Sequence, residues 1–181
     1  GTLRNVYNTA TVEAAGSYAG GITGLLERAT LSGAYNRGEV IATSYAGGVV
    51  GYSYLGIRTD YSTYRNNNIN NVYSSGTVSA NSYAGGVIGY DNPTVYSGGY
   101  NPRTNLYYDI TVIANYDQKK TTKPSTDPST QGINSGVFFK EMSTKLSNLF
   151  YFEVMTDDEA YYPQLNVFSN SETEDILSNS I

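Results

Sequence analysis

The sequence predicts an all-β fold, a short right-handed parallel β-helix followed by a small C-terminal α+β cap. An eight-residue block occurs three times with nearly the same sequence, at residues 17–24 (SYAGGITG), 44–51 (SYAGGVVG) and 82–89 (SYAGGVIG). A second block precedes each of these, at residues 5–12, 33–40 and 71–78. The intervals between the glycine-rich blocks are 27 and 38 residues, and a period in the twenties is typical of a solenoid. Right-handedness is expected because crossovers between parallel strands nearly always have that hand.

The earlier block predicts two strands joined by a turn. After the turn, apolar and polar residues alternate, and this period of two places one set of valines in the interior. These valines are Val12, Val40 and Val78. The turn itself holds Ala10, Gly38 and Gly76. Glycine at two of three equivalent positions predicts a positive φ there.

The glycine-rich block predicts a third strand, so that each coil has three. If this block is one extended run, Ile22, Val49 and Val87 share a face with its first glycines. Glycine inside a strand marks the close approach of another backbone, and stacked coils about 4.8 Å apart supply one. Equivalent residues then form ladders along the stack. The predicted ladders are Tyr18, Tyr45 and Tyr83; Gly21, Gly48 and Gly86; and Tyr7, Tyr35 and Tyr73.

These two blocks together resemble the GLUG-motif repeats of large bacterial surface and secreted proteins. The resemblance covers residues 1–108 and rests on the Gly-Gly-apolar-apolar-Gly pattern and the Val-containing block before it. It implies a structural or adhesion module with other domains of the same large protein as partners. GLUG-motif repeats also occur beside the catalytic regions of IgA-cleaving metalloproteases. Because the chain starts at Gly1 rather than at a Met or a signal peptide, we expect it to be a piece of a longer protein.

An insertion at Ser53–Asn70 accounts for the eleven extra residues of the second interval. Insertions in repeat proteins form loops, often on the binding face. Tyr and Arg are common at interface hot spots, so the insertion holds the candidate partner contacts. These are Tyr54, Arg58, Tyr61, Tyr64 and Arg65. An ordinary solvated loop is the alternative.

The C-terminal third predicts a cap and a linker. Asn105–Tyr116 reads as the last strands, and residues 109–168 as a capping region over the end of the solenoid, since its last coil exposes backbone and core. A helical stripe within Phe138–Phe150 predicts one short helix. Strands are expected at Tyr151–Val154 and Tyr161–Phe168. The Ser/Asn/Glu-rich residues 169–181 predict a disordered linker.

Composition narrows the chemistry. The chain has no Cys and no His, which excludes disulfides, thiolate sites, most hydrolytic triads and nearly all zinc sites. The predicted module therefore has no catalytic residue, no cofactor and no metal, with Ca²⁺ at Asp157–Glu159 as the one metal alternative. A net charge of −5 without a basic stripe argues against nucleic acid as a partner, and no apolar run is long enough for membrane insertion.

The expected function is that of a non-catalytic stalk or host-interaction domain at the bacterial cell surface or outside the cell. Its expected external partner is a host protein or a glycan. Two alternatives stay open: an accessory domain of a secreted surface protease, and a glycan-binding module whose tyrosines stack on sugars.

Overall fold

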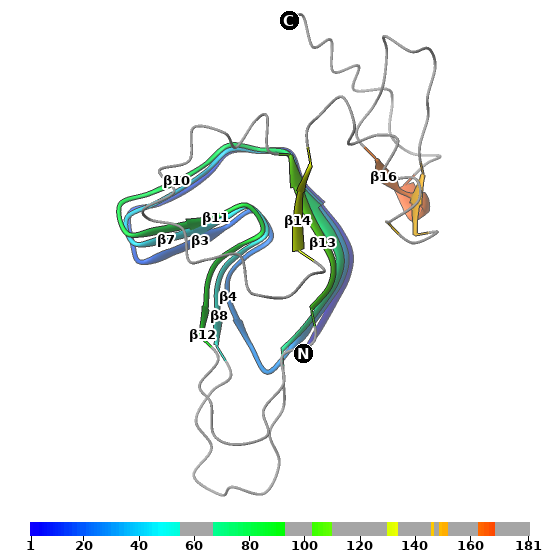
Figure 1. Cartoon of the computed structure of the whole chain (residues 1–181), viewed down its shortest axis with the longest axis horizontal. Helices are drawn as coiled ribbons and strands as arrows, with labels where there is room; N and C mark the ends of the chain where they lie inside the picture. The colour runs from blue at the N-terminus through cyan, green and yellow to red at the C-terminus, as the bar shows by residue number, and fades with distance from the viewer. Residues whose placement is uncertain are drawn as a thin grey trace, which may run out of the picture.

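A computed structural model of the chain describes residues 1–54, 67–92, 103–109, 130–133, 146, 149–151 and 163–168. Their regular structure is almost entirely β, and parallel strands from successive coils lie on one another (Figure 1). The part of the chain that the structure describes contains no helix long and apolar enough to cross a membrane.

Each complete coil contributes four strands. The first coil contains β1 (Thr2–Asn8), β2 (Val12–Ala14), β3 (Tyr18–Gly20) and β4 (Thr23–Glu27). The second contains β5 (Thr30–Asn36), β6 (Val40–Ala42), β7 (Tyr45–Gly47) and β8 (Val50–Tyr54). The third contains β9 (Asn68–Ser74), β10 (Val78–Ala80), β11 (Tyr83–Gly85) and β12 (Ile88–Asn92).

Equivalent strands pair in parallel and form four sheets, which confirms the predicted parallel β-helix. Sheet A has the order β1-β5-β9-β13-β14, where β13 is Arg103–Asp109 and β14 is Thr130–Ile133. Sheet B is β10-β6-β2, sheet C is β11-β7-β3 and sheet D is β12-β8-β4. Sheet A thus extends past residue 108, where the sequence analysis places the end of the repeats.

The strand register places like residues beside one another. Val40 pairs with Val12 and Val78, and Tyr45 pairs with Tyr18 and Tyr83. Val40 is fully buried, and the other two valines pack against its cluster. In sheet A the ladder of Tyr7, Tyr35 and Tyr73 continues to Tyr107. These are the ladders that the repeat alignment predicts, with one further rung.

The prediction of three strands per coil is wrong, because the glycine-rich block bends in its middle. Sheet C ends at the first glycine of each pair, and sheet D begins three residues later. A Cβ on Gly47 would lie 1.9 Å from the carbonyl oxygen of Val50 and 2.5 Å from the amide nitrogen of Gly89. No side chain fits inside this bend, which explains the glycine at this position. Because the block bends here, it is not the single extended run expected from the sequence.

The glycines of the earlier turn have a different cause from the predicted one. Among the glycines that the structure describes, only Gly33 has a positive φ. A Cβ on Gly38 would instead lie 1.9 Å from the carbonyl oxygen of Ala10, and one on Gly76 would lie 1.9 Å from that of Gly38. Stacking of one turn on the next therefore excludes a side chain there.

Residues with a left-handed backbone conformation lie within the strands of sheet A. The sequence analysis expected this conformation in the turn at Gly38 and Gly76 instead. One residue in each of the strands β1, β5, β9 and β13 has a positive φ: Asn5 (53°), Gly33 (62°), Asn71 (52°) and Asn105 (55°). Asn and Gly tolerate this conformation better than other residues. The Asn105 side chain also donates to Oδ1 of Asn71 at 2.9 Å, which ties adjacent coils together at this bend.

Two clusters of apolar side chains fill the interior of the coils. Sheets A and D enclose the main core, which includes Leu31, Val50, Ile69, Val72 and Leu106. Sheets B and C form a thin arm (Figure 1), filled by Ala19, Val40, Ala42 and Ala46. Alanine allows the two sheets of the arm to approach closely, whereas the larger residues fill the wider body.

A C-terminal segment covers the outer face of sheet A. β15 (Phe150–Tyr151) and β16 (Gln164–Leu165) form an antiparallel pair, followed by the 3-10 turn η1 (Asn166–Phe168). Phe150 and Leu165 pack on the tyrosine ladder, and Tyr73 donates its hydroxyl to the carbonyl oxygen of Pro163. Among the described residues of the predicted capping region, β14 pairs with β13 at the end of sheet A, and the C-terminal segment covers the side of that sheet.

Several boundaries differ from those expected. Ser53 and Tyr54 belong to β8, and residues 68–70 belong to β9. The predicted insertion Ser53–Asn70 therefore includes the end of one strand and the start of the next. Of the described part of the expected strand Tyr161–Phe168, residues 163–168, only 164–165 are extended. Phe150 lies in β15, whereas most of the predicted helix, most of Tyr151–Val154 and all of the linker at 169–181 lie outside the described residues.

We expect Gly47→Ala to lower the free energy of unfolding by at least about 2 kcal/mol, because its Cβ would overlap backbone atoms that cannot move independently. Gly16→Ala is the matched control, since no atom lies within 4 Å of its Cβ position, and should change stability by less than about 0.5 kcal/mol. Urea denaturation followed by circular dichroism measures both. Equal stability of the two variants would contradict the close-packing explanation.

Leu165→Ala should cost about 2–5 kcal/mol, the usual range for a buried leucine, because Leu165 is fully buried on the tyrosine ladder. Val167→Ala, two residues away and 62% exposed, should be nearly neutral. Thermal unfolding of the two variants separates these cases. If both are neutral, the C-terminal segment does not stabilise sheet A.

Candidate functional site

The corner between sheets D and A is where the coils differ most. In the first coil it is a short turn through Arg28, which has a φ of 48°. In the second and third coils, residues 55–66 and 93–102 connect the same two sheets. Four residues flank these connections: Ser53 and Asn67 lie beside the first, and Asp91 and Arg103 beside the second. We call these four residues the polar clasp.

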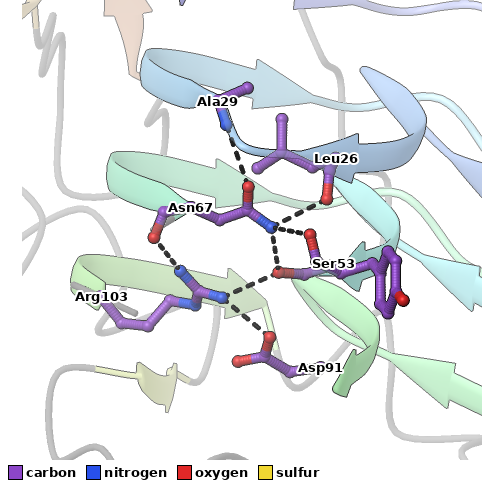
Figure 2. Close-up of polar contacts among 7 residues, drawn as sticks. Leu26, Ala29, Ser53, Asn67, Asp91 and Arg103 are labelled. Atoms are coloured by element: carbon purple, nitrogen blue, oxygen red, sulfur yellow. Dashed lines mark hydrogen bonds and ion pairs between the residues drawn. The ribbon is translucent and has the colours of Figure 1, made fainter. Parts of the chain in front are cut away.

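Asn67 joins three coils at the centre of the polar clasp (Figure 2). Its Nδ2 donates to the carbonyl oxygen of Leu26 at 2.8 Å, to that of Tyr54 at 3.0 Å and to Oγ of Ser53 at 3.1 Å. Its Oδ1 accepts from the amide of Ala29 at 3.0 Å. A fully buried side-chain amide with these partners replaces backbone pairing that the long connection interrupts.

Arg103, the first residue of β13, ties the strand that follows the third coil to the same point. Its Nη1 donates to the carbonyl oxygen of Asn67 at 3.0 Å, and its Nη2 to Oγ of Ser53 at 2.9 Å. The same Nη2 forms an ion pair with Oδ1 of Asp91 at 2.8 Å. Arg103 is buried, whereas the Asp91 side chain is partly exposed, so the pair lies at the boundary between core and solvent (Figure 2).

The polar clasp occupies positions that are apolar in the first coil. Ser53 is in register with both Leu26 and Asp91, and Ile69 is in register with Leu31 and Arg103. The leucine pair at the first corner between sheets D and A, Leu26 and Leu31, is thus replaced by the Asp91–Arg103 ion pair at the third such corner. The sequence analysis missed the polar clasp, although aligning β4, β8 and β12 in register would have shown this change from Leu to Ser to Asp.

Six tyrosines gather where sheets C and D meet at the bend. Tyr18, Tyr45 and Tyr83 come from sheet C, and Tyr52, Tyr54 and Tyr90 lie beside them on β8 and β12. Neighbouring ring centroids lie between 5.0 Å (Tyr18–Tyr52) and 5.9 Å (Tyr52–Tyr54). Tyr18 is 40% exposed and Tyr83 is 36% exposed. We call this group the tyrosine cluster.

Ring orientation limits what the tyrosine cluster can bind. Tyr45 and Tyr83 stack at 5.3 Å with 9° between their planes, and Tyr18 stacks on Tyr45 at the same distance with 28°. Stacked rings cover each other's faces, and a sugar needs an uncovered face to stack on. Burial raises the pKa of the Tyr45 phenol, and the phenols of Tyr18 and Tyr83 raise it further. Its hydroxyl is therefore neutral at physiological pH.

The predicted contact residues are only partly located. Tyr54 lies in β8, where its ring stacks on Tyr52 and its carbonyl oxygen accepts from Asn67. Arg58, Tyr61, Tyr64 and Arg65 lie outside the described residues, as does the Ca²⁺ alternative at Asp157–Glu159. Within the described ranges, no three acidic side chains come close enough together to hold a metal ion.

Arg103→Leu should lower the free energy of unfolding by about 3 kcal/mol, because it leaves Asp91 without its ion-pair partner. The double variant Asp91→Leu/Arg103→Leu should regain more than half of this loss, since it places Leu at the register positions of Leu26 and Leu31. Urea denaturation of the single and double variants checks this. A double variant no more stable than Arg103→Leu would show that the ion pair itself is required.

The comparisons with known proteins leave the family open. No family model matches the chain, and no match was found among the curated proteins or the solved structures. The resemblance to GLUG-motif repeats therefore stays a prediction made from the repeated blocks, whereas the solenoid architecture rests on the strand register described above.

Proposed function

We propose that this chain is a non-catalytic structural module of a large cell-surface or secreted bacterial protein. In this proposal the solenoid is a rigid spacer, and one corner of it presents residues 55–66 and 93–102 to a partner. The rest of the parent protein supplies its other domains. The resemblance to GLUG-motif repeats supports the cellular location.

The observation that carries this proposal is that the stack keeps its register across both long connections. Ser53 remains paired with Asp91, and Ile69 remains paired with Arg103. The polar clasp restores the hydrogen bonding that each connection interrupts. A solenoid built in this way can vary one corner while its core stays unchanged, as in repeat proteins that carry binding loops on one face.

The composition of residues 55–66 favours a protein as the partner. It contains two tyrosines and two arginines within eight residues, Arg58, Tyr61, Tyr64 and Arg65, and these residue types dominate the energetics of protein interfaces. A glycan is the less favoured partner, because the tyrosines that the structure describes stack on one another.

Binding of the whole chain to immobilised extracellular-matrix proteins and to a glycan array tests the proposal. We expect a protein ligand, and we expect Tyr61→Ala/Tyr64→Ala to weaken its binding at least about tenfold, since loss of one hot-spot residue costs more than about 1.4 kcal/mol. Thr59→Ala/Ser62→Ala, in the same segment, is the matched control and should bind as the parent chain does.

Thermal unfolding should show the same midpoint for both variants, which separates loss of binding from loss of fold. If the chain binds no ligand, or if both variants bind equally well, the proposal that residues 55–66 contact a partner is wrong. Cleavage of a peptide or polysaccharide substrate by the purified chain would contradict the non-catalytic assignment.

A further inference from the structure

The phenol rings of the tyrosine cluster can be oxidised, and the proposed spacer function makes no use of this reactivity. We propose that Tyr18, Tyr45, Tyr52, Tyr54, Tyr83 and Tyr90 form an oxidative modification site, at which a one-electron oxidant joins neighbouring phenols as dityrosine. A link between Tyr45 and either Tyr18 or Tyr83 would join adjacent coils covalently in a chain that has no cysteine.

The reaction balances with a one-electron oxidant as the only co-reactant. Each of two phenols loses one electron to the oxidant and one proton to solvent, which gives two phenoxyl radicals. The radicals form one carbon–carbon bond between ring carbons ortho to the oxygens. The hydrogen on each of these carbons then moves to the oxygen as a proton, so both rings become phenols again. The protein loses two hydrogen atoms in total.

The register of sheets C and D places the reacting rings together before any oxidant arrives. Tyr45 lies at the centre, with ring centroids of Tyr18 and Tyr83 at 5.3 Å and that of Tyr52 at 5.7 Å. Tyr18 also lies 5.0 Å from Tyr52. Groups held this close react as if at very high effective concentration, so coupling within one chain outcompetes coupling between chains.

Exposure and composition direct the oxidant to these phenols. The rings at the two ends of the sheet C ladder, Tyr18 and Tyr83, are 40% and 36% exposed. Cysteine and tryptophan, the other side chains that lose an electron readily, are absent from the sequence. Oxidation of any member of the tyrosine cluster leaves the radical within 5.9 Å of another phenol ring.

The chain contains its own matched control in sheet A. Tyr35 and Tyr73 stack at 5.1 Å with 7° between their planes, nearly the same geometry as Tyr45 and Tyr83. Both are fully buried beneath Phe150 and Leu165. If proximity alone decided coupling, the Tyr35–Tyr73 pair would react as readily as the tyrosine cluster; if exposure is also required, it would not. Tyr7, at the end of the same ladder, is 40% exposed and stacks on Tyr35 at 5.1 Å, so links to Tyr7 are counted separately from links between the two buried rings.

Photo-oxidation of the whole chain by ruthenium tris-bipyridyl with persulfate, at low protein concentration, tests the proposal. Dityrosine fluorescence measures the yield, gel electrophoresis separates monomers from dimers, and peptide mapping by mass spectrometry locates the joined residues. We expect monomers that have lost two hydrogen atoms, with links among the six tyrosines of the cluster.

Tyr45→Phe/Tyr52→Phe should reduce the dityrosine yield of the monomer severalfold, because at least one of these two residues takes part in nearly all the close pairs of the cluster. Tyr73→Phe, which removes the buried Tyr35–Tyr73 pair but keeps the exposed Tyr7 beside Tyr35, should leave the yield unchanged. Phenylalanine keeps the ring stacking, and circular dichroism confirms that both variants fold.

Three results would overturn the proposal. They are links between Tyr35 and Tyr73 as frequent as those in the tyrosine cluster, dityrosine found only in dimers, and links confined to tyrosines outside the cluster. Mapping in the unsubstituted chain gives this answer even if a variant fails to fold.

Discussion

The close stacking of one coil on the next is the constraint from which the rest of this structure follows. The amide of Gly48 donates to the carbonyl oxygen of Gly85 at 2.9 Å, and the amide of Val50 donates to that of Val87 at 2.9 Å. A Cβ on Gly48 would lie 2.1 Å from the carbonyl oxygen of Gly86. Each coil must therefore follow the path of its neighbour, including its bends. Glycine recurs where the backbone folds back on itself, because a side chain there would separate the coils.

Stacking in register also fixes what can vary. A residue in the core contacts its equivalents in the coils on either side, so a polar residue among apolar ones needs partners from its own coil or the next. The polar clasp meets this requirement at one corner only. There, Leu26 and Leu31 are followed along the stack by Ser53 and Ile69, and then by the Asp91–Arg103 pair. The connections between sheets D and A also differ in length at this corner. The polar clasp therefore lies where the chain accommodates its long insertions.

The repeated sequence allowed the parallel stack and its ladders to be predicted, because each position was sampled three times. Tyr18, Tyr45 and Tyr83 are aligned in the sequence and adjacent in the structure. The bend at Gly47–Gly48 was not predicted, because glycine permits both a straight strand and a turn. The polar clasp and the contact of Tyr73 with Pro163 join residues far apart in the sequence. No local pattern encodes such contacts. Of the candidate site, only Tyr54 and the ladder tyrosines could be placed from the sequence and then located.

The two tyrosine ladders show that one repeated residue type can serve two purposes in a single fold. Their ring spacings are nearly equal, 5.1 Å in sheet A and 5.3 Å in sheet C, because the coil spacing determines both. What differs is the environment. Phe150 and Leu165 cover Tyr35 and Tyr73 and make these rings part of the core, so that Tyr7 is the exposed end of the first ladder, whereas Tyr18 and Tyr83 stay partly exposed at both ends of the second. A phenol under apolar cover contributes burial and packing alone. A phenol at the surface is accessible to an oxidant, and the stack holds a second phenol ring about 5.3 Å from it. The coil spacing thus sets the geometry of both ladders, and the C-terminal segment removes the inner rings of one of them, Tyr35 and Tyr73, from solvent.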